Sequence, residues 1–423
     1  MLQLARIRPA ILIGLVLLLI AAPLAAQGGP TAPTGKGAEL SVVLLTFGNG
    51  DQVYEKFGHN AIWIHDPLQG TDRVYNYGLF DFHSPGYWGR FVKGTWLYQI
   101  GVADMYQTMA EYEYLNRTVT AQELNLTPVQ KLQLQSFLDW NARPENAQYP
   151  YDYFRDNCST RVRDAIDRVL GGQIQRATAG IPTNTTFRWH SRRLLTDGPV
   201  VYTGLEAGLG EAADRPIDAW EEMFLPEKVQ QRVRNLQVTL PNGTRAPLVL
   251  SERALYTARG RAPEPAAPPS WILGYLLAGA AFGLAVAGLA AAAARSRTAR
   301  FGFSLLTVAW GFLVGMGGLL LLGLWLFTDH TIAHRNENLF QFTVFALPLV
   351  ILAPAAAYGA RWAVRPARAL AFVAAASSLL GFVLQLLPGL DQVNGEIIAL
   401  LLPAHLAVAW AVVRVASSRQ PAS

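Results

Sequence analysis

The chain has 423 residues, of which 51% are hydrophobic and only 15% are charged. This composition is too apolar for one soluble globule and indicates a membrane protein with a soluble part. The formal net charge of +5 does not indicate nucleic-acid binding, because much of the arginine flanks apolar segments, as in membrane proteins.

The N-terminal residues have the pattern of a secretory signal. Two arginines precede an apolar core and a run of mainly small residues (Arg6, Arg8, residues 11–20 and 21–26). We interpret residues 1–27 as a signal peptide or an uncleaved anchor. In either case the following segment is delivered outside the cytoplasm. Residues 28–38 are a linker rich in Gly, Pro and Thr.

Residues 39–259 have the composition of a soluble, extracytoplasmic domain. Apolar runs predict strands at 40–47, 58–64, 73–77 and 96–102. Helical spacing predicts helices at 105–114, at 128–141 and from Cys158 onward. Asn242-Gly243 predicts a hairpin turn. Neighbouring strands combined with separate helices indicate an α+β fold.

The rest of the chain predicts a five-helix transmembrane bundle. A Pro/Ala-rich linker at 260–270 precedes residues 271–415, which contain apolar runs at 271–294, 303–327, 339–360, 369–387 and 397–413. Arginines follow the first and third runs and the last one, so the positive-inside rule places these connections and the 416–423 tail in the cytoplasm. The 39–259 domain is then extracytoplasmic.

Cys158 is the only cysteine, and it lies at the start of a predicted helix. A helix N-terminus favours the thiolate, which is the reactive form of cysteine. His59 leads into an apolar strand, so it is a candidate base that would take the thiol proton. We expect His65, His83 and His190 to be ordinary polar or loop residues in contact with solvent.

A third group should orient the imidazole of His59. Asn76 on the next predicted strand is our candidate, and Tyr75 or Tyr77 could equally serve. The predicted catalytic residues are therefore Cys158, His59 and Asn76. Residues beside the cysteine are predicted to contact substrate: Asn157, Ser159 and Arg161.

A polar connection at 328–338 separates the second and third apolar runs, on the same side of the membrane as the domain. Its candidates for binding a lipid phosphate or the acceptor amine are His330, Arg335, Asn336 and Asn338. Equally, the two asparagines could simply cap the third span. His405 inside the fifth run is either functional or a hydrogen-bonding group within the bundle.

Aromatic residues are dense between Trp63 and Trp96. They pack in the core or, where exposed, suit an acyl-chain groove or the bilayer interface. One cysteine and scattered histidines lack the spacing of zinc ligands, and no phosphate-binding glycine motif or serine-hydrolase elbow occurs. We therefore expect neither a metal nor a cofactor.

A series of motifs between about residues 40 and 226 resembles the Lnb-type bacterial lipoprotein N-acyltransferases. These motifs are FGHNA (57–61), YNYGLFDF (75–82), FVKG (91–94) and YDYFRDNCSTR (151–161). The resemblance implies a circularly permuted papain-like domain related to the NlpC hydrolases, with Cys158 as nucleophile and His59 as base. A similar order of histidine and Asn-Cys occurs in lecithin:retinol acyltransferases, which pass acyl groups through a cysteine thioester.

We therefore expect an α+β, permuted papain-like domain followed by the five-helix bundle, in the bacterial inner membrane. The expected activity moves an acyl chain from a membrane phospholipid to the N-terminal amine of a lipoprotein. A cell-wall peptidase or amidase of the NlpC kind would use the same two residues, and a non-enzymatic membrane scaffold would use neither.

Overall fold

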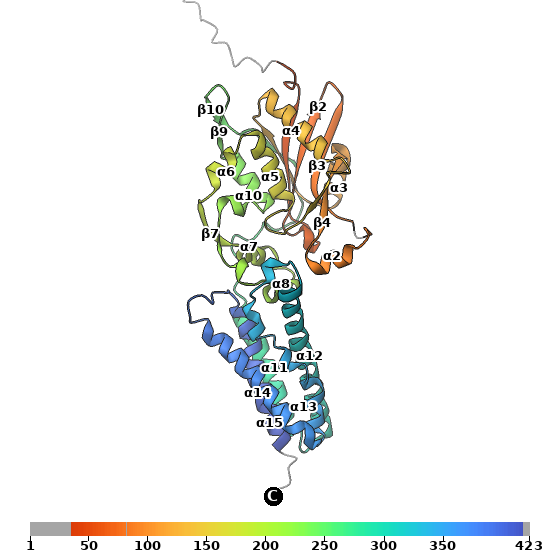
Figure 1. Cartoon of the computed structure of the whole chain (residues 1–423), viewed down its shortest axis with the longest axis vertical. Coiled ribbons are helices and arrows are strands. Elements are labelled where there is room, and N and C mark those ends of the chain that lie inside the picture. Colours follow the sequence, from red (N-terminus) through yellow and green to blue (C-terminus); the bar gives the residue numbers. More distant parts are fainter. Residues whose placement is uncertain (1–34, 82, 418–423) are drawn as a thin grey trace, which may run out of the picture.

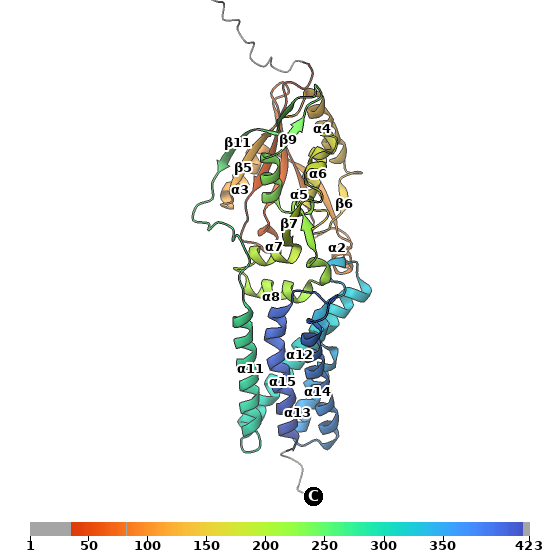
Figure 2. The ribbon, with the colours of Figure 1, turned by 90° about the vertical axis from the view of Figure 1, so that its left-hand side faces the viewer.

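The computed structural model describes residues 35–81 and 83–417. The predicted signal at 1–27, most of the 28–38 linker and most of the 416–423 tail lie outside the described residues. A mixed sheet-and-helix domain stands on one end of a bundle of long helices, and helix α15 (Gly395–Ser417) runs to the opposite end (Figure 1). Helix α8 (Pro199–Gly208) lies across the end of the bundle that faces the domain (Figure 2).

The domain is built around a seven-stranded antiparallel sheet with the order β11-β5-β1-β2-β3-β4-β6. The strands are β1 (Ser41–Phe47), β2 (His59–Asp66), β3 (Thr71–Leu79), β4 (Leu97–Asp104), β5 (Val119–Leu124), β6 (Gln148–Pro150) and β11 (Val249–Tyr256). The four predicted strands correspond to β1–β4. The other three gave no strong signal, because they are short or polar.

Smaller elements complete the domain. The helices are α2 (Tyr87–Lys93), α3 (Met105–Tyr114), α4 (Pro128–Asn141), α5 (Cys158–Val169), α6 (Gln173–Thr178), α7 (Phe187–Leu194), α9 (Ala219–Glu222) and α10 (Pro226–Arg234), with 3-10 turns η1 (Val53–Glu55) and η2 (Glu211–Ala213). Two short ribbons pair β7 (Pro182–Thr186) with β8 (Pro216–Asp218) and β9 (Gln237–Thr239) with β10 (Arg245–Pro247). The second is the predicted hairpin.

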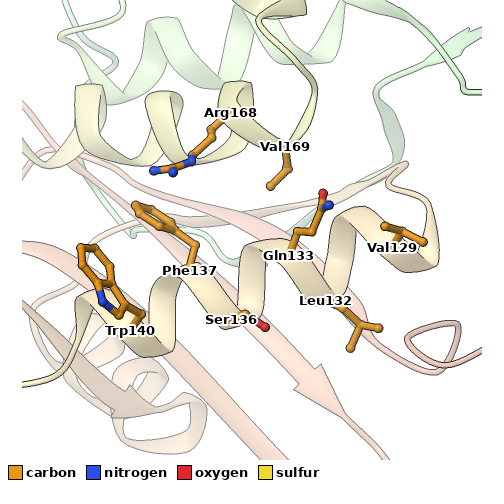
Figure 3. A pocket seen from close by; sticks show the side chains of 8 residues that line it. All are labelled: Val129, Leu132, Gln133, Ser136, Phe137, Trp140, Arg168 and Val169. Atoms are coloured by element: carbon orange, nitrogen blue, oxygen red, sulfur yellow. The ribbon is translucent and has the colours of Figure 1, made fainter.

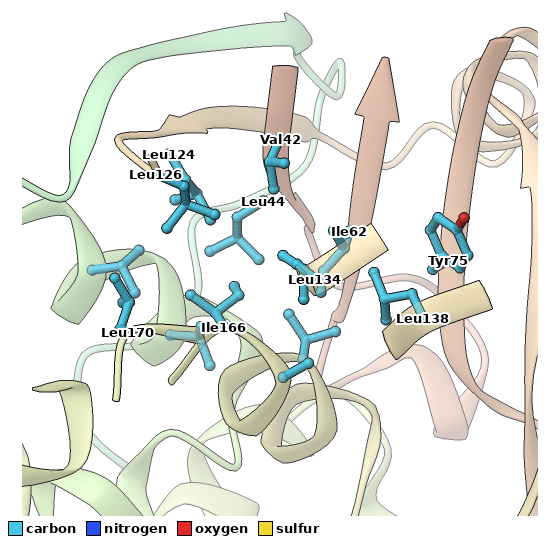
Figure 4. Packing of buried hydrophobic residues seen from close by; sticks show 14 of the residues in the cluster. Val42, Leu44, Ile62, Tyr75, Leu124, Leu126, Leu134, Leu138, Ile166 and Leu170 are labelled. Atoms are coloured by element: carbon cyan, nitrogen blue, oxygen red, sulfur yellow. The ribbon is translucent and has the colours of Figure 1, made fainter. Parts of the chain in front are cut away.

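Strand β1 has an apolar centre, residues 42–45, because both of its faces are covered. Val42 and Leu44 pack in the cluster that α4 and α5 cover, and Figure 4 shows them above Ile166. Val43 and Leu45 belong to a second cluster on the α3 face. Burying an aliphatic side chain such as Ile166 contributes about 1.5–3 kcal/mol. The amphipathic α5 is thereby fixed against the sheet, which in turn fixes the residue at its start.

The bundle contains α11 (Ile272–Ala292), α12 (Arg297–Phe327), α13 (Leu349–Ala357), α14 (Arg361–Leu384) and α15 (Gly395–Ser417). In the described part of the chain, four of these helices are long and apolar enough to cross a membrane, and a bent pair would make five. Helices α12 and α14 begin at basic residues ahead of the predicted starts at 303 and 369, because arginine can extend its charged end to water from within a helix.

The third predicted span, 339–360, is not one helix. It is broken into η4 (Glu337–Phe340), η5 (Val344–Ala346) and α13, with a bend of 51°. Glycines on α12 allow the non-helical backbone to lie directly against that helix. A Cβ on Gly318 would stand 2.5 Å from the carbonyl oxygen of Phe342. Irregular backbone is tolerated at membrane depth where protein covers it, so close packing on α12 explains the break.

Candidate active site

Cys158 is the first residue of α5, and Asn157 caps that helix. The Asn157 side-chain oxygen accepts hydrogen bonds from the backbone N–H groups of Ser159 and Thr160, at 2.9 and 3.0 Å. Its amide nitrogen donates to the carbonyl oxygens of Tyr153 and Phe224, both at 2.9 Å. A helix cap of this kind contributes about 1 kcal/mol. The sequence predicts that Asn157 contacts substrate. In the structure its side chain caps α5 and so positions Cys158.

The thiol lies between the start of α5 and the sheet. Backbone N–H groups of Asn60, Cys158 and Ser159 point at the sulfur, and the Ser159 hydroxyl is 3.9 Å from it. Gly78 on β3 makes room, because a Cβ there would stand 3.2 Å from the Cβ of Cys158. Gly78 also has a φ of 89°, which side-chain-bearing residues rarely adopt. Asn60 follows His59 directly, so the thiol borders the strand end that carries the predicted base.

His59 is held by Asn76 across β2 and β3. The distance from His59 Nε2 to Asn76 Oδ1 is 3.3 Å, and the amide nitrogen of Asn76 donates to the carbonyl oxygen of Val74. That orientation leaves the amide oxygen to accept, so Nε2 carries the imidazole proton and Nδ1 is free to take one. The ring stacks on Phe47 with centroids 5.7 Å apart. Asn76 thus fixes the orientation of the His59 imidazole.

Tyr75 and Tyr77, the alternatives to Asn76, point to the other face of the sheet. The Tyr75 hydroxyl donates to Asp139 at 2.6 Å, and the Tyr77 hydroxyl donates to Asn141 at 2.7 Å. Successive strand residues face opposite sides, so neither tyrosine can orient His59.

The pKa shifts of His59 and Cys158 both favour the uncharged forms of these side chains. Burial, together with the nearby charge of Arg117, lowers the pKa of His59 to about 4. Burial also raises the pKa of the Cys158 thiol, and the backbone N–H groups at the sulfur only partly offset this. The N–H groups at the helix start do lower the thiol pKa, as predicted, but burial outweighs them and the pKa is raised overall. At neutral pH the resting pair is a thiol and an unprotonated imidazole.

We expect alkylation of Cys158 by iodoacetamide to be slow at neutral pH and to accelerate with rising pH. The reason is that only the thiolate reacts and the thiol pKa is raised. Quantifying the alkylated Cys158 peptide by mass spectrometry between about pH 5 and pH 10 checks this. A fast rate that is constant between about pH 5 and pH 7 would instead reveal a thiolate–imidazolium pair.

Proton transfer requires the two groups to approach. Within residues 35–81 and 83–417, the imidazole of His59 does not hydrogen-bond the Cys158 sulfur. Catalytic hydrogen bonds are often loose without substrate and tighten in the complex. A nucleophile–base pair of His59 and Cys158 would therefore have to form when substrate binds.

The remaining predicted residues next to the cysteine have structural partners. Ser159 is fully buried. Both Arg161 Nε and Nη2 donate to Asp156, and the guanidinium lies 4.2 Å from the centroid of the Tyr149 ring. Arg161 therefore braces the segment before α5 with its charge already paired.

The membrane connection at 328–338 reaches into the domain through His330. His330 Nε2 is 3.1 Å from the carbonyl oxygen of Phe91, and its ring meets Trp96 edge-on with centroids 5.4 Å apart. The backbone N–H of Asp329 donates to the carbonyl oxygen of Lys93 at 2.7 Å. This part of the connection is thus docked on the domain.

Asn336 and Asn338 are buried where α8 meets the bundle. The amide of Asn336 donates to the carbonyl oxygens of Ala207 and Gly208, and that of Asn338 donates to those of Glu206 and Ala207, at 2.8–3.1 Å. Carbonyls at a helix C-terminus lack partners inside the helix. The two asparagines supply these partners, which joins the domain to the bundle.

Replacing Asn338 with alanine should lower the free energy of unfolding by about 1–3 kcal/mol, because buried carbonyls lose their donors. Thermal unfolding of the purified protein measures the change. Activity per folded molecule should stay near that of the wild type. An unchanged melting temperature together with lost activity would instead support the substrate contact predicted from sequence.

Arg335 is the one exposed side chain of the four connection residues, at 76%, and its guanidinium forms an ion pair with Glu211. Its backbone is left-handed, with a φ of 52°, and Glu211 lies 3.6 Å away. Both residues border a hollow of about 420 Å³ that Leu322, Trp325 and Phe345 help to line. This arrangement offers a charge beside an apolar recess at the end of the bundle.

A larger hollow of about 750 Å³ lies between α4 and α5 (Figure 3). Its α5 residues, Arg168 and Val169, lie at the C-terminal end of the helix, away from Cys158. This hollow is therefore not part of the thiol site.

The other histidines behave differently from one another. His83 is exposed and His65 is partly exposed beside Asp72, as expected. The prediction of solvent contact is wrong for His190, which is fully buried and within 3.4 Å of Thr185 Oγ1 and Glu222. His405 hydrogen-bonds the carbonyl oxygen of Gln341 at 2.9 Å inside the bundle, so the bundle-contact interpretation describes its position.

Sequence reasoning missed the buried supports of His59. Arg117 pairs with Glu55 at 3.3 Å, and its guanidinium lies over Tyr112, which stacks on Phe47 behind the imidazole. No motif connects these residues, which only the sheet brings together. Among the described residues, no group of three or more His, Cys, Asp or Glu side chains could hold a metal ion.

Comparison with known families gives one match. The family model described as the Lnb N-terminal periplasmic domain matches residues 34–197. This range contains Cys158, His59 and Asn76 and confirms the resemblance seen in the motifs. Searches of curated proteins and of solved structures found no match.

Proposed function

We propose that this protein is a thiol-dependent lipoprotein N-acyltransferase of the Lnb family. The match of residues 34–197 to the Lnb N-terminal periplasmic domain supports this, as do the helices that are long and apolar enough to cross a membrane. Its domain would be permuted papain-like, in the bacterial inner membrane with the C-terminus in the cytoplasm. The observation that carries the proposal is the arrangement of Cys158 at a capped helix start beside the strand of His59, itself oriented by Asn76.

The first half-reaction forms a thioester. His59 Nδ1 takes the proton of the Cys158 thiol as the sulfur attacks the ester carbonyl of a membrane lipid. The tetrahedral intermediate collapses, the ester C–O bond breaks, and the imidazolium gives its proton to the leaving alcohol. The acyl chain is then bonded to sulfur, and His59 is again neutral.

The second half-reaction transfers the acyl chain to nitrogen. The unprotonated α-amine of a lipoprotein N-terminus attacks the thioester carbonyl, and His59 takes an amine proton. The C–S bond breaks, and the thiolate regains the proton from His59. A neutral resting imidazole suits both halves, because the group begins each as a base.

The negative oxygen of each intermediate needs hydrogen-bond donors. Backbone N–H groups of Asn60, Cys158 and Ser159 surround the sulfur, so we assign the oxyanion site to this group. Removing a single donor from such a site typically costs about 10²–10³ in rate. Backbone donors cannot be removed by ordinary substitution. Their placement depends on the Asn157 cap and on the close approach of Cys158 to Gly78.

Contacts between the membrane connection and the thiol site support a substrate that comes from the bilayer. His330 meets Trp96, Trp96 lies 6.2 Å from Tyr151 between ring centroids, and Tyr151 stacks on Tyr98 at 3.9 Å. The pKa of Tyr151 is raised by burial and by the charge of Cys158, so this ring lies near the thiol. An aromatic wall thus runs from the bundle toward Cys158 and would suit an acyl chain.

Arg335 offers a binding point for the lipid headgroup. Its exposed guanidinium and the adjoining apolar hollow match a phosphate and a hydrocarbon chain, respectively. A cell-wall peptidase would need neither this recess nor a domain joined to the bundle through buried asparagines.

Mass spectrometry of a lipoprotein's N-terminal lipopeptide tests the proposal. The host is a strain in which this modification depends on the protein, with an empty vector as the control. We expect an N-linked acyl chain only when the protein is present. Identical lipopeptides in both strains, together with new peptidoglycan fragments, would replace acyl transfer with wall hydrolysis.

A further inference from the structure

Helix α2 presents an apolar face away from the domain. Trp88 and Val92 are one helical turn apart, and their exposed fractions are 63% and 65%. The adjoining side of the helix is held in place, since Tyr87 is buried and Phe91 stacks on Trp96 with centroids 5.3 Å apart. The helix is thus attached to the domain, while the side chains of Trp88 and Val92 remain largely exposed.

The position of α2 identifies what covers this face. The helix lies at the end of the domain nearest the bundle (Figures 1 and 2). Its last residue, Lys93, accepts the hydrogen bond from Asp329, two residues beyond the end of α12. The final residues of α12, Leu326 and Phe327, are 62% and 79% exposed. The apolar surface of the bundle therefore continues to the level of α2.

Gly94 allows the end of α2 to lie close to the backbone of Asp329 and His330. Gly94 ends α2 with a φ of 82°, and a Cβ there would stand 2.9 Å from the backbone nitrogen of His330. The fixed spacing between α2 and the bundle leaves the helix no freedom to lie far from the membrane surface. Helix α12 has 31 residues, or about 46 Å at 1.5 Å per residue. This length is enough to cross a hydrocarbon core of about 30 Å and to bring the end next to Asp329 to the membrane interface.

We infer that α2 lies in the outer-leaflet interface, with Trp88 and Val92 among the lipid acyl chains. Tryptophan favours this depth, and Lys93 at the end of the helix would face anionic headgroups. The helix leads through Trp96 to the aromatic wall beside Cys158, so it brings the mouth of the thiol site to the lipid. This membrane contact is separate from the acyl-transfer chemistry and holds whatever reaction Cys158 performs.

The test uses the full chain with Cys158→Ala, which removes its one thiol. Val92→Cys is labelled with the polarity-sensitive dye NBD, and the protein is reconstituted in phosphatidylcholine–phosphatidylglycerol vesicles. Leu68→Cys is the matched control, because Leu68 is 78% exposed in the turn between β2 and β3. Phe372→Cys on the exposed side of α14 marks a bilayer position.

We expect blue-shifted emission at position 92 and roughly twofold or greater quenching by lipids with a nitroxide near the headgroup, since interfacial helices lie about 5–10 Å deep. Position 68 should show neither effect. Emission at 92 that matches 68 would overturn the inference. A blue shift at 92 without quenching by nitroxide lipids would also overturn it, since protein rather than lipid would then cover α2.

Discussion

Replacing Cys158 with alanine should lower N-acyl transfer by about 10⁴-fold or more, because the reaction loses its nucleophile. Alanine retains the Cβ that packs beside Gly78, and the Asn157 cap does not involve the thiol. The variant should therefore fold and unfold like the wild type. Transfer of a labelled acyl chain by the purified, reconstituted protein measures the rate.

Cys158→Ser provides the matched control, since it keeps the size of the side chain and replaces the thiol with a hydroxyl. A serine next to a neutral imidazole is a weaker nucleophile than cysteine, so activity should remain far below that of the wild type. Unaltered transfer by Cys158→Ala would exclude a thioester and would favour the non-enzymatic or non-thiol alternatives.

Replacing His59 with alanine should lower transfer by about 10²–10⁴-fold, the usual contribution of general acid–base catalysis. The wild-type rate should not fall in acid until the pH approaches about 4, because His59 is unprotonated above that pKa. Below it, the protonated imidazole cannot accept the thiol proton. A pH–rate profile of wild type and His59→Ala checks both parts.

Asn76→Ala separates orientation from chemistry. It leaves the imidazole in place and removes the 3.3 Å contact to Nε2, so the loss should be smaller than for His59→Ala. The acid limb of the pH profile should also move to lower pH, because the hydrogen bond with Asn76 raises the pKa of His59 and its loss lowers that pKa. Equal rates in Asn76→Ala and wild type would show that another group orients the base.

The elements around the site could be predicted because local rules and packing agree there. Strand β1 has an apolar centre covered on both faces, and α5 combines a capping Asn157 with buried residues at helical spacing. Asn76 could be placed on the strand next to His59 from strand order alone, and β2 and β3 do pair antiparallel, with Asn76 opposite Ala61. Successive side chains on a strand point to opposite faces of the sheet. Once the faces are known, this alternation selects Asn76 rather than Tyr75 or Tyr77 as the partner of His59.

The rest depends on contacts between distant segments. An apolar stretch such as 339–360 has the composition of a span, but the glycines of α12 determine that its first part is not helical. Asn336 and Asn338 look like loop residues until α8, more than a hundred residues earlier, brings its carbonyls to them. The thiol pKa likewise depends on burial, which a helix-start rule does not include.

The most direct test of the account is to look for the acylated enzyme. The full-length protein is incubated with a phospholipid carrying a labelled acyl chain, without any acceptor, and the peptide containing Cys158 is analysed by mass spectrometry. The account predicts one acyl chain on Cys158, released by neutral hydroxylamine and passed to an added lipopeptide amine. Labelled N-acyl product formed while Cys158 remains unacylated throughout would contradict it.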